Sequence, residues 1–269
     1  MKSLVFYKYE GLGNDFLLVE ADHATLVSPA LARAMCERRR GAGADGVLLV
    51  NGVDGKPTMR VLNADGSTPE MCGNGLRCVA LHLARARGLS TLDLLVETDA
   101  GPRSCLVDDR DGAGIVTVDM GFVRTGEDVR VDLDGDPWEL SLADAGNPHA
   151  ITTRKVSRAT IDLVGHRLAT APRFAQGTNV EFASFGPTGI DLIVWERGVG
   201  ITEACGTGAC ATVAVGVAKG WIAKDREVDV RLPGGTLSVT YRNDGHAVMR
   251  GPARKVFTGE WNVEGGSIQ

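Results

Sequence analysis

One short pattern occurs twice in this sequence, once in each half of the chain, and each copy stands at the start of a helix-like stretch. Met71-Cys72-Gly73-Asn74-Gly75 leads into residues 75–87, and Ala204-Cys205-Gly206-Thr207-Gly208 leads into residues 208–219. A C-G-x-G match alone is weak evidence. Its recurrence before a helix in both halves indicates two similar domains. We predict the boundary between them near residue 115.

Short segments rich in Val, Ile and Leu, separated by Gly, Asp and Asn, are typical of β-strands. They outnumber the helix-like stretches and often follow one another directly, which favours an α+β fold with mixed, largely antiparallel sheets over a doubly wound parallel sheet. Strands are expected at residues 4–9, 16–20, 47–50, 92–97, 115–120, 181–183, 190–195, 228–232, 236–241 and 247–250. Helices are expected at residues 29–39, 75–87, 159–168 and 208–219.

The composition excludes several functional classes. Of the 269 residues, 43% are hydrophobic and 23% charged, which is typical of a globular protein with a substantial core. The formal net charge of −5 leaves no basic excess to replace phosphate counterions, so no nucleic-acid partner is expected. Because the sequence has neither a long apolar run nor a secretory signal, we expect a cytoplasmic protein without a membrane partner.

The six cysteines are too few for a disulfide scaffold and include no C-x-x-C pair, so neither disulfides nor a metal site is expected. Cys72 and Cys205 stand in glycine-flanked turns at helix starts, which are poor burial sites. We interpret the other four as small buried residues, as free cysteines commonly are; they are Cys36, Cys78, Cys105 and Cys210.

Each C-G-x-G turn combines two chemical properties. Its glycines allow a tight turn that exposes successive N–H groups. These groups and the positive end of the helix dipole form a site for a carboxylate. The same field lowers the pKa of a cysteine thiol and raises its thiolate fraction. We therefore expect a carboxylate cradle and an activated thiol in each turn.

Two such turns facing each other would hold one carboxylate and place a sulfur on each side of the adjacent carbon. One thiolate would remove the α-proton of an amino acid while the opposite thiol protonates the other face, which inverts the configuration. Preorganised N–H donors would stabilise the developing carbanion. No lysine stands in an obvious pyridoxal-phosphate context, so no cofactor is expected.

Further polar residues suit contacts with a substrate. Asparagines in glycine-bearing turns are ordinary turn residues, but four of them beside strands indicate hydrogen bonds to a polar ligand: Asn14, Asn63, Asn147 and Asn179. His149 is a candidate partner for a thiol, and Glu196, at a strand end before Cys205, is another. Arg197 offers a bidentate grip on a second carboxylate. The alternative for Glu196 and Arg197 is a surface charge pair.

Two patterns carry no expected function. The basic run 37–40 follows an apolar-periodic stretch, and we interpret it as the cationic C-terminus of a helix. Residues 41–46 match G-x-G-x-x-G, but a helix-like stretch precedes them and a strand follows. The dinucleotide fingerprint requires the reverse order, so NAD binding is not expected.

Together these residues resemble the diaminopimelate epimerase family, and the similarity runs the length of the chain. Its motifs appear as G-L-G-N-D-F at 11–16, N-A-D-G-S at 63–67, M-C-G-N-G at 71–75, G-N-P-H at 146–149, and E-R-G at 196–198 followed by A-C-G-T-G-A-C at 204–210. The resemblance implies interconversion of LL- and meso-diaminopimelate in lysine and peptidoglycan precursor synthesis, without pyridoxal phosphate or metal.

The resemblance also implies an architecture. Two similar domains, residues 1–115 with 256–269 and residues 116–255, would each wrap a sheet around a central helix. The active site would lie in the interdomain cleft, and the enzyme would be a homodimer.

Residue roles follow from the same resemblance. Cys72 and Cys205 would be the acid and base, assisted by His149 and Glu196 respectively. The reacting carboxylate would be cradled by Gly73, Asn74, Gly206 and Thr207. The other polar groups of the substrate would be held by Asn14, Asn63, Asn147, Asn179, Glu196 and Arg197.

The sequence departs from the family at two positions. Gly46 stands where many members have a substrate-contacting glutamine, and Ile201 where glutamate is more common. Three alternatives stay open: another two-thiol racemase on this scaffold acting on proline, hydroxyproline or histidine, a thiol redox protein, and a non-catalytic amino-acid binding protein.

Overall fold

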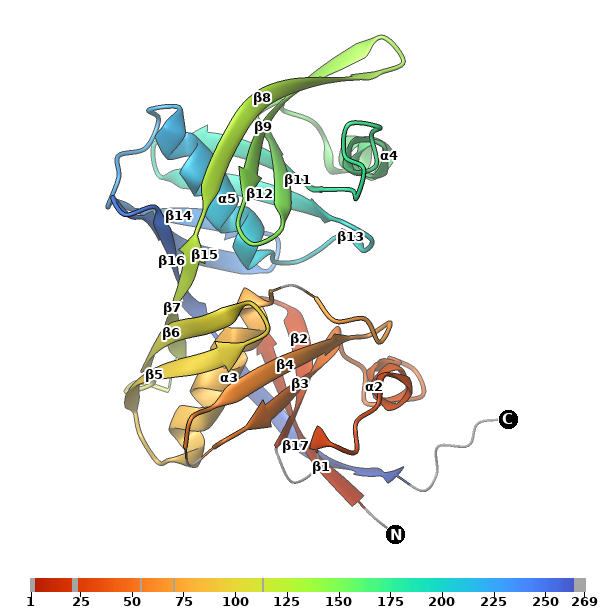
Figure 1. Ribbon diagram of the computed structural model, residues 1–269, viewed down its shortest axis with the longest axis vertical. Coiled ribbons are helices and arrows are strands. Elements are labelled where there is room, and N and C mark those ends of the chain that lie inside the picture. The colour runs from red at the N-terminus through yellow and green to blue at the C-terminus, as the bar shows by residue number, and fades with distance from the viewer. Residues whose placement is uncertain (1–2, 21–23, 54, 70, 113, 264–269) are drawn as a thin grey trace. The chain divides into compact units, whose positions relative to one another are not determined.

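The computed structural model describes residues 3–20, 24–53, 55–69, 71–112 and 114–263 (Figure 1). The chain divides into two compact units, Met1–Val118 with Gly251–Gln269, and Asp119–Arg250. It passes from one unit to the other within β7 (Ile115–Phe122) and returns within β16 (His246–Pro252). The domain limits expected from the sequence, at 115 and 256, stay predictions, and residues 264–269 of the expected return lie outside the described residues.

The sheet of the first unit combines parallel and antiparallel pairs. β2 (Asn14–Glu20) runs parallel to β3 (Gly46–Asn51), and β4 (Thr58–Asn63) runs parallel to β5 (Thr91–Thr98). The other neighbours are antiparallel, in the pairs β3–β4, β5–β6 (Gly101–Asp108), β6–β7, β1 (Ser3–Gly11)–β2 and β1–β17 (Arg254–Asn262). Helix α3 (Gly73–Ala86) contacts strands β1 to β6 and β17, so the sheet curves around it.

The sheet of the second unit has the same alternation. β10 (Pro148–Thr152) runs parallel to β11 (Asn179–Gly186), and β12 (Gly189–Glu196) runs parallel to β14 (Glu227–Leu232). The antiparallel pairs are β8 (Arg124–Leu133)–β9 (Asp136–Asp144), β9–β10, β11–β12, β12–β13 (Gly200–Ile201), β14–β15 (Gly235–Tyr241) and β15–β16. Helix α5 (Gly206–Ala218) contacts β8 to β11 and β15 and forms the centre of the unit.

The two units therefore repeat one topology. In each unit a smaller helix follows the first strand of the first parallel pair, α2 (Pro29–Cys36) after β2 and α4 (Arg158–Ala169) after β10. The central helix α3 follows β4 in the first unit, and α5 follows β12 in the second, with the two-residue strand β13 between them. The predicted α+β class and the duplication indicated by the two C-G-x-G turns are confirmed. Within the described ranges, no helix is long and apolar enough to cross a membrane.

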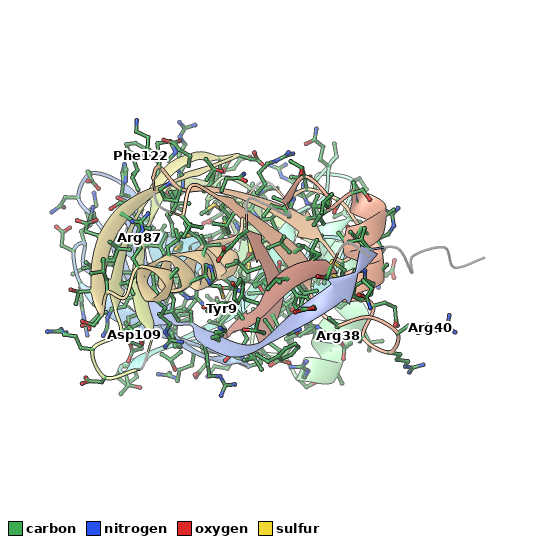
Figure 2. All side chains as sticks on the ribbon, turned by 90° about the horizontal axis from the view of Figure 1, so that it is seen from below. Tyr9, Arg38, Arg40, Arg87, Asp109 and Phe122 are labelled. Carbon is green, nitrogen blue, oxygen red and sulfur yellow. The ribbon has the colours of Figure 1, made fainter. Side chains whose placement is uncertain are left out.

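The basic run at 37–40 is not a helix terminus, so that interpretation is wrong. Helix α2 ends at Cys36 because Glu37 takes an extended conformation. Arg38 then turns back and donates two hydrogen bonds to Asp15, of 2.7 and 3.2 Å, and one of 2.6 Å to Asp45. Arg40 points away from the fold (Figure 2).

Candidate active site

Cys72 is the N-cap of α3, and its sulfur accepts a hydrogen bond from the Gly75 N–H at 3.3 Å. Such a cap replaces one of the N–H partners that a helix start lacks. A side chain at position 75 would not fit without rearrangement, because a Cβ there would lie 2.8 Å from Leu48 Cδ2 and 3.1 Å from Cys72 Sγ. Glycine at this position therefore lets the sulfur approach the helix.

Cys205 caps α5 in the same way. Its sulfur accepts a hydrogen bond from the Gly208 N–H at 3.4 Å, and the Thr207 hydroxyl lies 3.5 Å from it. A Cβ at Gly208 would lie 3.2 Å from the sulfur and 2.8 Å from Glu181 Oε1. The two cysteines thus occupy equivalent positions in the two repeated units.

The residues expected to cradle a carboxylate stand in the first turns of these helices. Gly73 and Asn74 are the first two residues of α3, and Gly206 and Thr207 are the first two of α5. Neither first turn contains an acidic residue. The N–H groups and the positive helix dipole are consequently not opposed by a carboxylate side chain of the same turn.

Asn14 is held in place by a polar chain within the first unit. Its amide donates to Asp45 Oδ2 at 2.7 Å, and its oxygen accepts from Asn74 Nδ2 at 3.1 Å. The Asn74 oxygen in turn accepts from Arg77 Nη1 at 2.9 Å. Arg77 is fully buried and also donates to the Pro252 carbonyl at 3.1 Å. The chain connects Asn14 to the second residue of α3.

Two cationic side chains pair with the aspartates at the Asn14 end of this hydrogen-bond series. Lys8, which is 7% exposed, pairs with Asp15, and Arg38 bridges Asp15 and Asp45. Burial raises the pKa of the Asp15 carboxyl, but hydrogen bonds from Arg38 and Lys8 outweigh it and lower the pKa overall.

Asn63 ends β4 and donates to the Ser67 hydroxyl at 3.0 Å.

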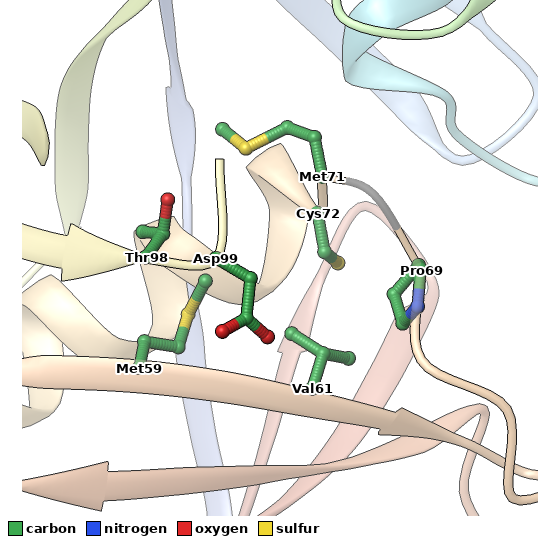
Figure 3. A pocket seen from close by; sticks show the side chains of 7 residues that line it. All are labelled: Met59, Val61, Pro69, Met71, Cys72, Thr98 and Asp99. Atoms are coloured by element: carbon green, nitrogen blue, oxygen red, sulfur yellow. The ribbon is translucent and has the colours of Figure 1, made fainter. Parts of the chain in front are cut away.

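Cys72 also borders a small hollow of the first unit (Figure 3). The side chains around it are mostly apolar, with one carboxylate; they are Met59, Val61, Pro69, Met71, Thr98 and Asp99. Apolar surroundings on one side of the sulfur limit its contact with water.

His149 is buried in the second unit and uses both ring nitrogens. Its Nδ1 lies 2.6 Å from Glu181 Oε1, and its Nε2 lies 2.9 Å from Asn147 Oδ1. The side chains of His149 and Glu181 are both 0% exposed. The sequence therefore led us to His149 and Asn147 but not to Glu181, the carboxylate that orients the ring.

Asn179 links the start of β11 to the end of β12. Its amide donates to the Pro148 carbonyl at 3.1 Å, and its oxygen accepts from the Arg197 backbone N–H at 2.9 Å. Arg197 Nη1 donates to the Gln176 carbonyl at 3.2 Å. Glu196 accepts a 2.6 Å hydrogen bond from the Thr202 hydroxyl. Glu196 and Arg197 are thus both held by local contacts within the unit.

The pKa of the Cys205 thiol is raised well above its ordinary value. Burial is the largest cause, and the nearby Glu196 and Glu181 carboxylates add to it. Hydrogen bonds from Thr207 and Gly208 act in the opposite direction but do not outweigh these effects. The expectation of a lowered pKa is wrong for Cys205, because the field of one helix start is weaker than burial combined with two carboxylates.

The structure gives physical reasons for both departures from the family pattern. A Cβ at Gly46 would lie 2.7 Å from the Leu62 carbonyl oxygen, so a longer side chain does not fit this backbone. Ile201 packs against the apolar core beneath α4. Both residues serve packing within their units.

Cys36, Cys78, Cys105 and Cys210 are buried, as expected. Cys205 is buried as well, so the expectation that a glycine-flanked turn is a poor burial site is wrong for this cysteine. Burial raises the pKa values of Cys36 and Cys105 to about 12. Across the described part of the chain, no cluster of three or more His, Cys, Asp or Glu residues is arranged to hold a metal ion.

The chain matches the family model described as diaminopimelate epimerase in two segments, residues 6–126 and 141–256. A diaminopimelate epimerase of Synechococcus elongatus is 42% identical over 282 residues, covering 97% of this chain and 99% of that protein. Diaminopimelate epimerase 1 of a Nostoc species is 40% identical, covering 96% of this chain and 99% of that protein.

Two solved structures share the fold at 16% sequence identity. A hydroxyproline epimerase from Agrobacterium vitis has a TM-score of 0.73, covering 96% of this chain and 92% of that one. A probable proline racemase from Agrobacterium radiobacter has a TM-score of 0.77, covering 98% and 94%.

The full-length match to epimerases places this protein of two repeated α+β units among the isomerases. Within this class, the chain belongs to the diaminopimelate epimerase family.

Proposed function

We propose that this enzyme interconverts LL- and meso-diaminopimelate by moving a proton on and off one α-carbon with Cys72 and Cys205. The observation that carries the proposal is the equivalence of the two thiols. Each caps the central helix of its unit, and each accepts a hydrogen bond from the glycine three residues later. Family membership supplies the substrate.

The reaction needs two groups on opposite faces of the α-carbon. One thiolate takes the α-proton, and the electron pair of the broken C–H bond remains on carbon as a carbanion. The other thiol gives its proton to the opposite face, which inverts the configuration and leaves a new thiolate. The two sulfurs exchange roles in the reverse direction. Because they carry out both proton transfers, the proposed reaction needs neither pyridoxal phosphate nor a metal.

Carbanion stabilisation comes from the helix starts. The α-proton of an amino acid is far less acidic than a thiol, so the negative charge that develops next to the carboxylate needs fixed donors. The N–H groups around Gly73, Asn74, Gly206 and Thr207 provide these when both turns reach the same carboxylate. The proposed chemistry therefore requires both helix starts.

The remaining polar residues hold the rest of the substrate. Diaminopimelate has a second amino-acid head, which needs both a cation and hydrogen-bond acceptors. Arg197 supplies the cation, and the asparagines supply amides: Asn14, Asn63, Asn147 and Asn179. The assignment of His149 to Cys72 and of Glu196 to Cys205 remains part of the proposal.

The proposal extends to the cellular setting. A lysine and peptidoglycan precursor enzyme with six free thiols suits the reducing cytoplasm. We propose a homodimer of chains with domains 1–115 plus 256–269 and 116–255. Its partner is the small amino-acid substrate, with no nucleic acid or membrane.

A solvent-exchange experiment tests the function. LL-diaminopimelate is incubated with the enzyme in deuterated water under reducing conditions, and the meso product is analysed by mass spectrometry and NMR. We expect one deuterium at the inverted α-carbon. A binding protein would exchange no α-proton, and a redox protein would lose its activity under reduction, so either result would contradict the proposal.

The rival substrates are tested in the same assay. Proline, hydroxyproline and histidine lack the second amino-acid head, so Arg197 and the asparagine set would be left without a partner. We expect no deuterium incorporation into these amino acids. Exchange into proline that exceeds exchange into diaminopimelate would favour the racemase alternative.

A further inference from the structure

The strongest unexplained feature is a buried carboxylate in the second unit. Glu181 is the third residue of β11, between Val180 and Phe182, and its side chain is 0% exposed. Its Oε1 contacts His149 Nδ1 at 2.6 Å, and its Oε2 has no hydrogen-bond partner among the described residues. A buried carboxylate is costly unless it is paired and fully hydrogen-bonded.

The equivalent position in the first unit shows that packing does not require an acid. Leu48 is the third residue of β3, as Glu181 is of β11. A Cβ at Gly75 would lie 2.8 Å from Leu48 Cδ2 and 3.1 Å from Cys72 Sγ. A Cβ at Gly208 would lie 2.8 Å from Glu181 Oε1 and 3.2 Å from Cys205 Sγ. The two thiols therefore have the same backbone setting, but a leucine accompanies one and a carboxylate the other.

The charged groups that act on the Cys205 thiol are two carboxylates. Glu181 on β11 and Glu196 at the end of β12 face the thiol, and Thr207 is its hydroxyl neighbour on α5. The Glu181 oxygen that contacts His149, Oε1, is also the atom that borders Gly208. Further along α5, Asp128 of β8 pairs with Lys219 at the C-terminal end of the helix.

We propose that Glu181 is a positioning residue of the epimerase, which keeps Cys205 as the protonated, proton-donating thiol of the substrate-free enzyme and fixes the ring of His149. This proposal rests on the proposed function. The two duplicated sites thus begin a turnover in different states, because the carboxylate replaces the leucine of the other unit.

The difference has a chemical use. A two-base reaction needs one thiol and one thiolate at the same time, and two identical cysteines would not determine which is which. Burial raises the pKa of the Glu181 carboxyl overall, although the contact with His149 lowers it. The ionised carboxylate disfavours a thiolate on Cys205, so the proton stays on this sulfur until the carbanion takes it. The sulfur then carries the charge as a thiolate, and the proton forms the new C–H bond.

The test measures the reactivity of each thiol without substrate. Wild type, Glu181→Gln and Glu181→Leu are alkylated with iodoacetamide from pH 6 to 10.5, and peptides are quantified by mass spectrometry. Cys72 falls in the tryptic peptide 61–77 and Cys205 in 198–219, where fragmentation separates it from Cys210. The glutamine keeps the size and a hydrogen bond to His149, whereas the leucine copies the other unit.

Removing a unit charge a few ångströms from a partly screened thiol changes its ionisation about 10- to 100-fold. At the low end of this range, we expect Cys205 to be alkylated about tenfold faster at pH 7.5 in both variants, with its midpoint lowered by about one pH unit. In Glu181→Gln, which keeps a hydrogen bond to His149, Cys72 serves as the internal control and should stay within about twofold of the wild-type rate. An unchanged Cys205 midpoint in Glu181→Gln would overturn the proposal.

A second readout keeps the proposal testable if a variant does not fold. In the wild type, the Cys205 midpoint should lie above the ordinary cysteine value of about 8.5, and a lower midpoint would overturn the proposal. In a folded Glu181→Gln enzyme, the basic limb of the kcat/KM profile should move to lower pH with KM little changed. The alkylation needs no turnover, so its failure is distinguishable from a failed deuterium experiment.

Discussion

Asp45 offers a quantitative test of how Asn14, which we propose to bind substrate, is positioned in the first unit. Its carboxylate accepts hydrogen bonds from Asn14 Nδ2 at 2.7 Å and from the Asp15 N–H at 3.0 Å, and it pairs with Arg38 at 2.6 Å. Asp45→Ala removes all three contacts. Because Asn14 then loses the acceptor that orients its amide, we expect weaker substrate binding as well as lower stability.

The size of the effect follows from the exposure of each contact. The two half-buried hydrogen bonds, from Asn14 and from the Asp15 N–H to Asp45, contribute about 1 kcal/mol each to the unfolding free energy. The Arg38–Asp45 pair contributes less than about 1 kcal/mol, because its side chains are 57% and 41% exposed and Arg38 keeps Asp15. We therefore expect the unfolding free energy to fall by about 2–3 kcal/mol. Loss of Asn14 orientation should raise KM about tenfold, equivalent to ~1.4 kcal/mol.

Urea denaturation followed by circular dichroism measures the stability, and initial rates with LL-diaminopimelate measure KM. Asp108→Ala is the matched control, because its pair with Arg110 is exposed in the same unit and should contribute less than about 1 kcal/mol. Asp45→Asn keeps an acceptor oxygen and should lie between the wild type and Asp45→Ala. A destabilised Asp45→Ala enzyme with unchanged KM would refute the role given to Asn14.

Three further predictions concern the substrate, the buried thiols and Gly46. Arg197→Ala should lower kcat/KM for diaminopimelate at least about 100-fold, ~2.7 kcal/mol of transition-state binding, with an unchanged circular dichroism spectrum; unaffected turnover would count against the substrate assignment. Burial raises the pKa values of Cys36 and Cys105 to about 12, so the folded thiols stay protonated at a pH where the unfolded thiols ionise. Stability should thus be fully present below pH ~9 and fall above it by up to ~1.4 kcal/mol per pH unit and thiol; urea midpoints that are flat from pH 8 to 10 would contradict this. Gly46→Gln should cost about 1–3 kcal/mol, since its Cβ would lie 2.7 Å from the Leu62 oxygen; a variant as stable as wild type by thermal denaturation would refute the steric reading.

Local sequence signals predicted the strands that are rich in apolar residues and bounded by Gly, Asp or Asn, but they missed exposed strands such as β8. β8 is largely solvent-exposed over its first five residues, so its sequence lacks the apolar run that marked β3 and β12. β4 and β10 are short and hold polar residues, and they form because neighbouring strands pair with them. Helix α3 begins at Gly73, two residues before the predicted start, because the Cys72 sulfur supplies the cap.

The candidate site residues that the sequence indicated are those with a local signature. Cys72 and Cys205 stand in repeated glycine turns, and the asparagines stand beside strand ends. Glu181 has no such signature, although a charged residue between Val180 and Phe182 in an apolar strand is a usable signal. Its partner His149 lies 32 residues earlier in the sequence, and only the parallel pairing of β10 with β11 brings them together.

The central claim is that two thiols act on opposite faces of one carbon, and the isotope content of recovered substrate tests it most directly. LL-diaminopimelate is converted in deuterated water to a few per cent completion, and product and remaining substrate are analysed separately. With two bases, the thiol that donates carries solvent deuterium, whereas the removed protium stays on the other sulfur. Product should therefore contain one deuterium while recovered substrate contains none. Deuterium in both pools at the earliest times would show a single base and contradict the account.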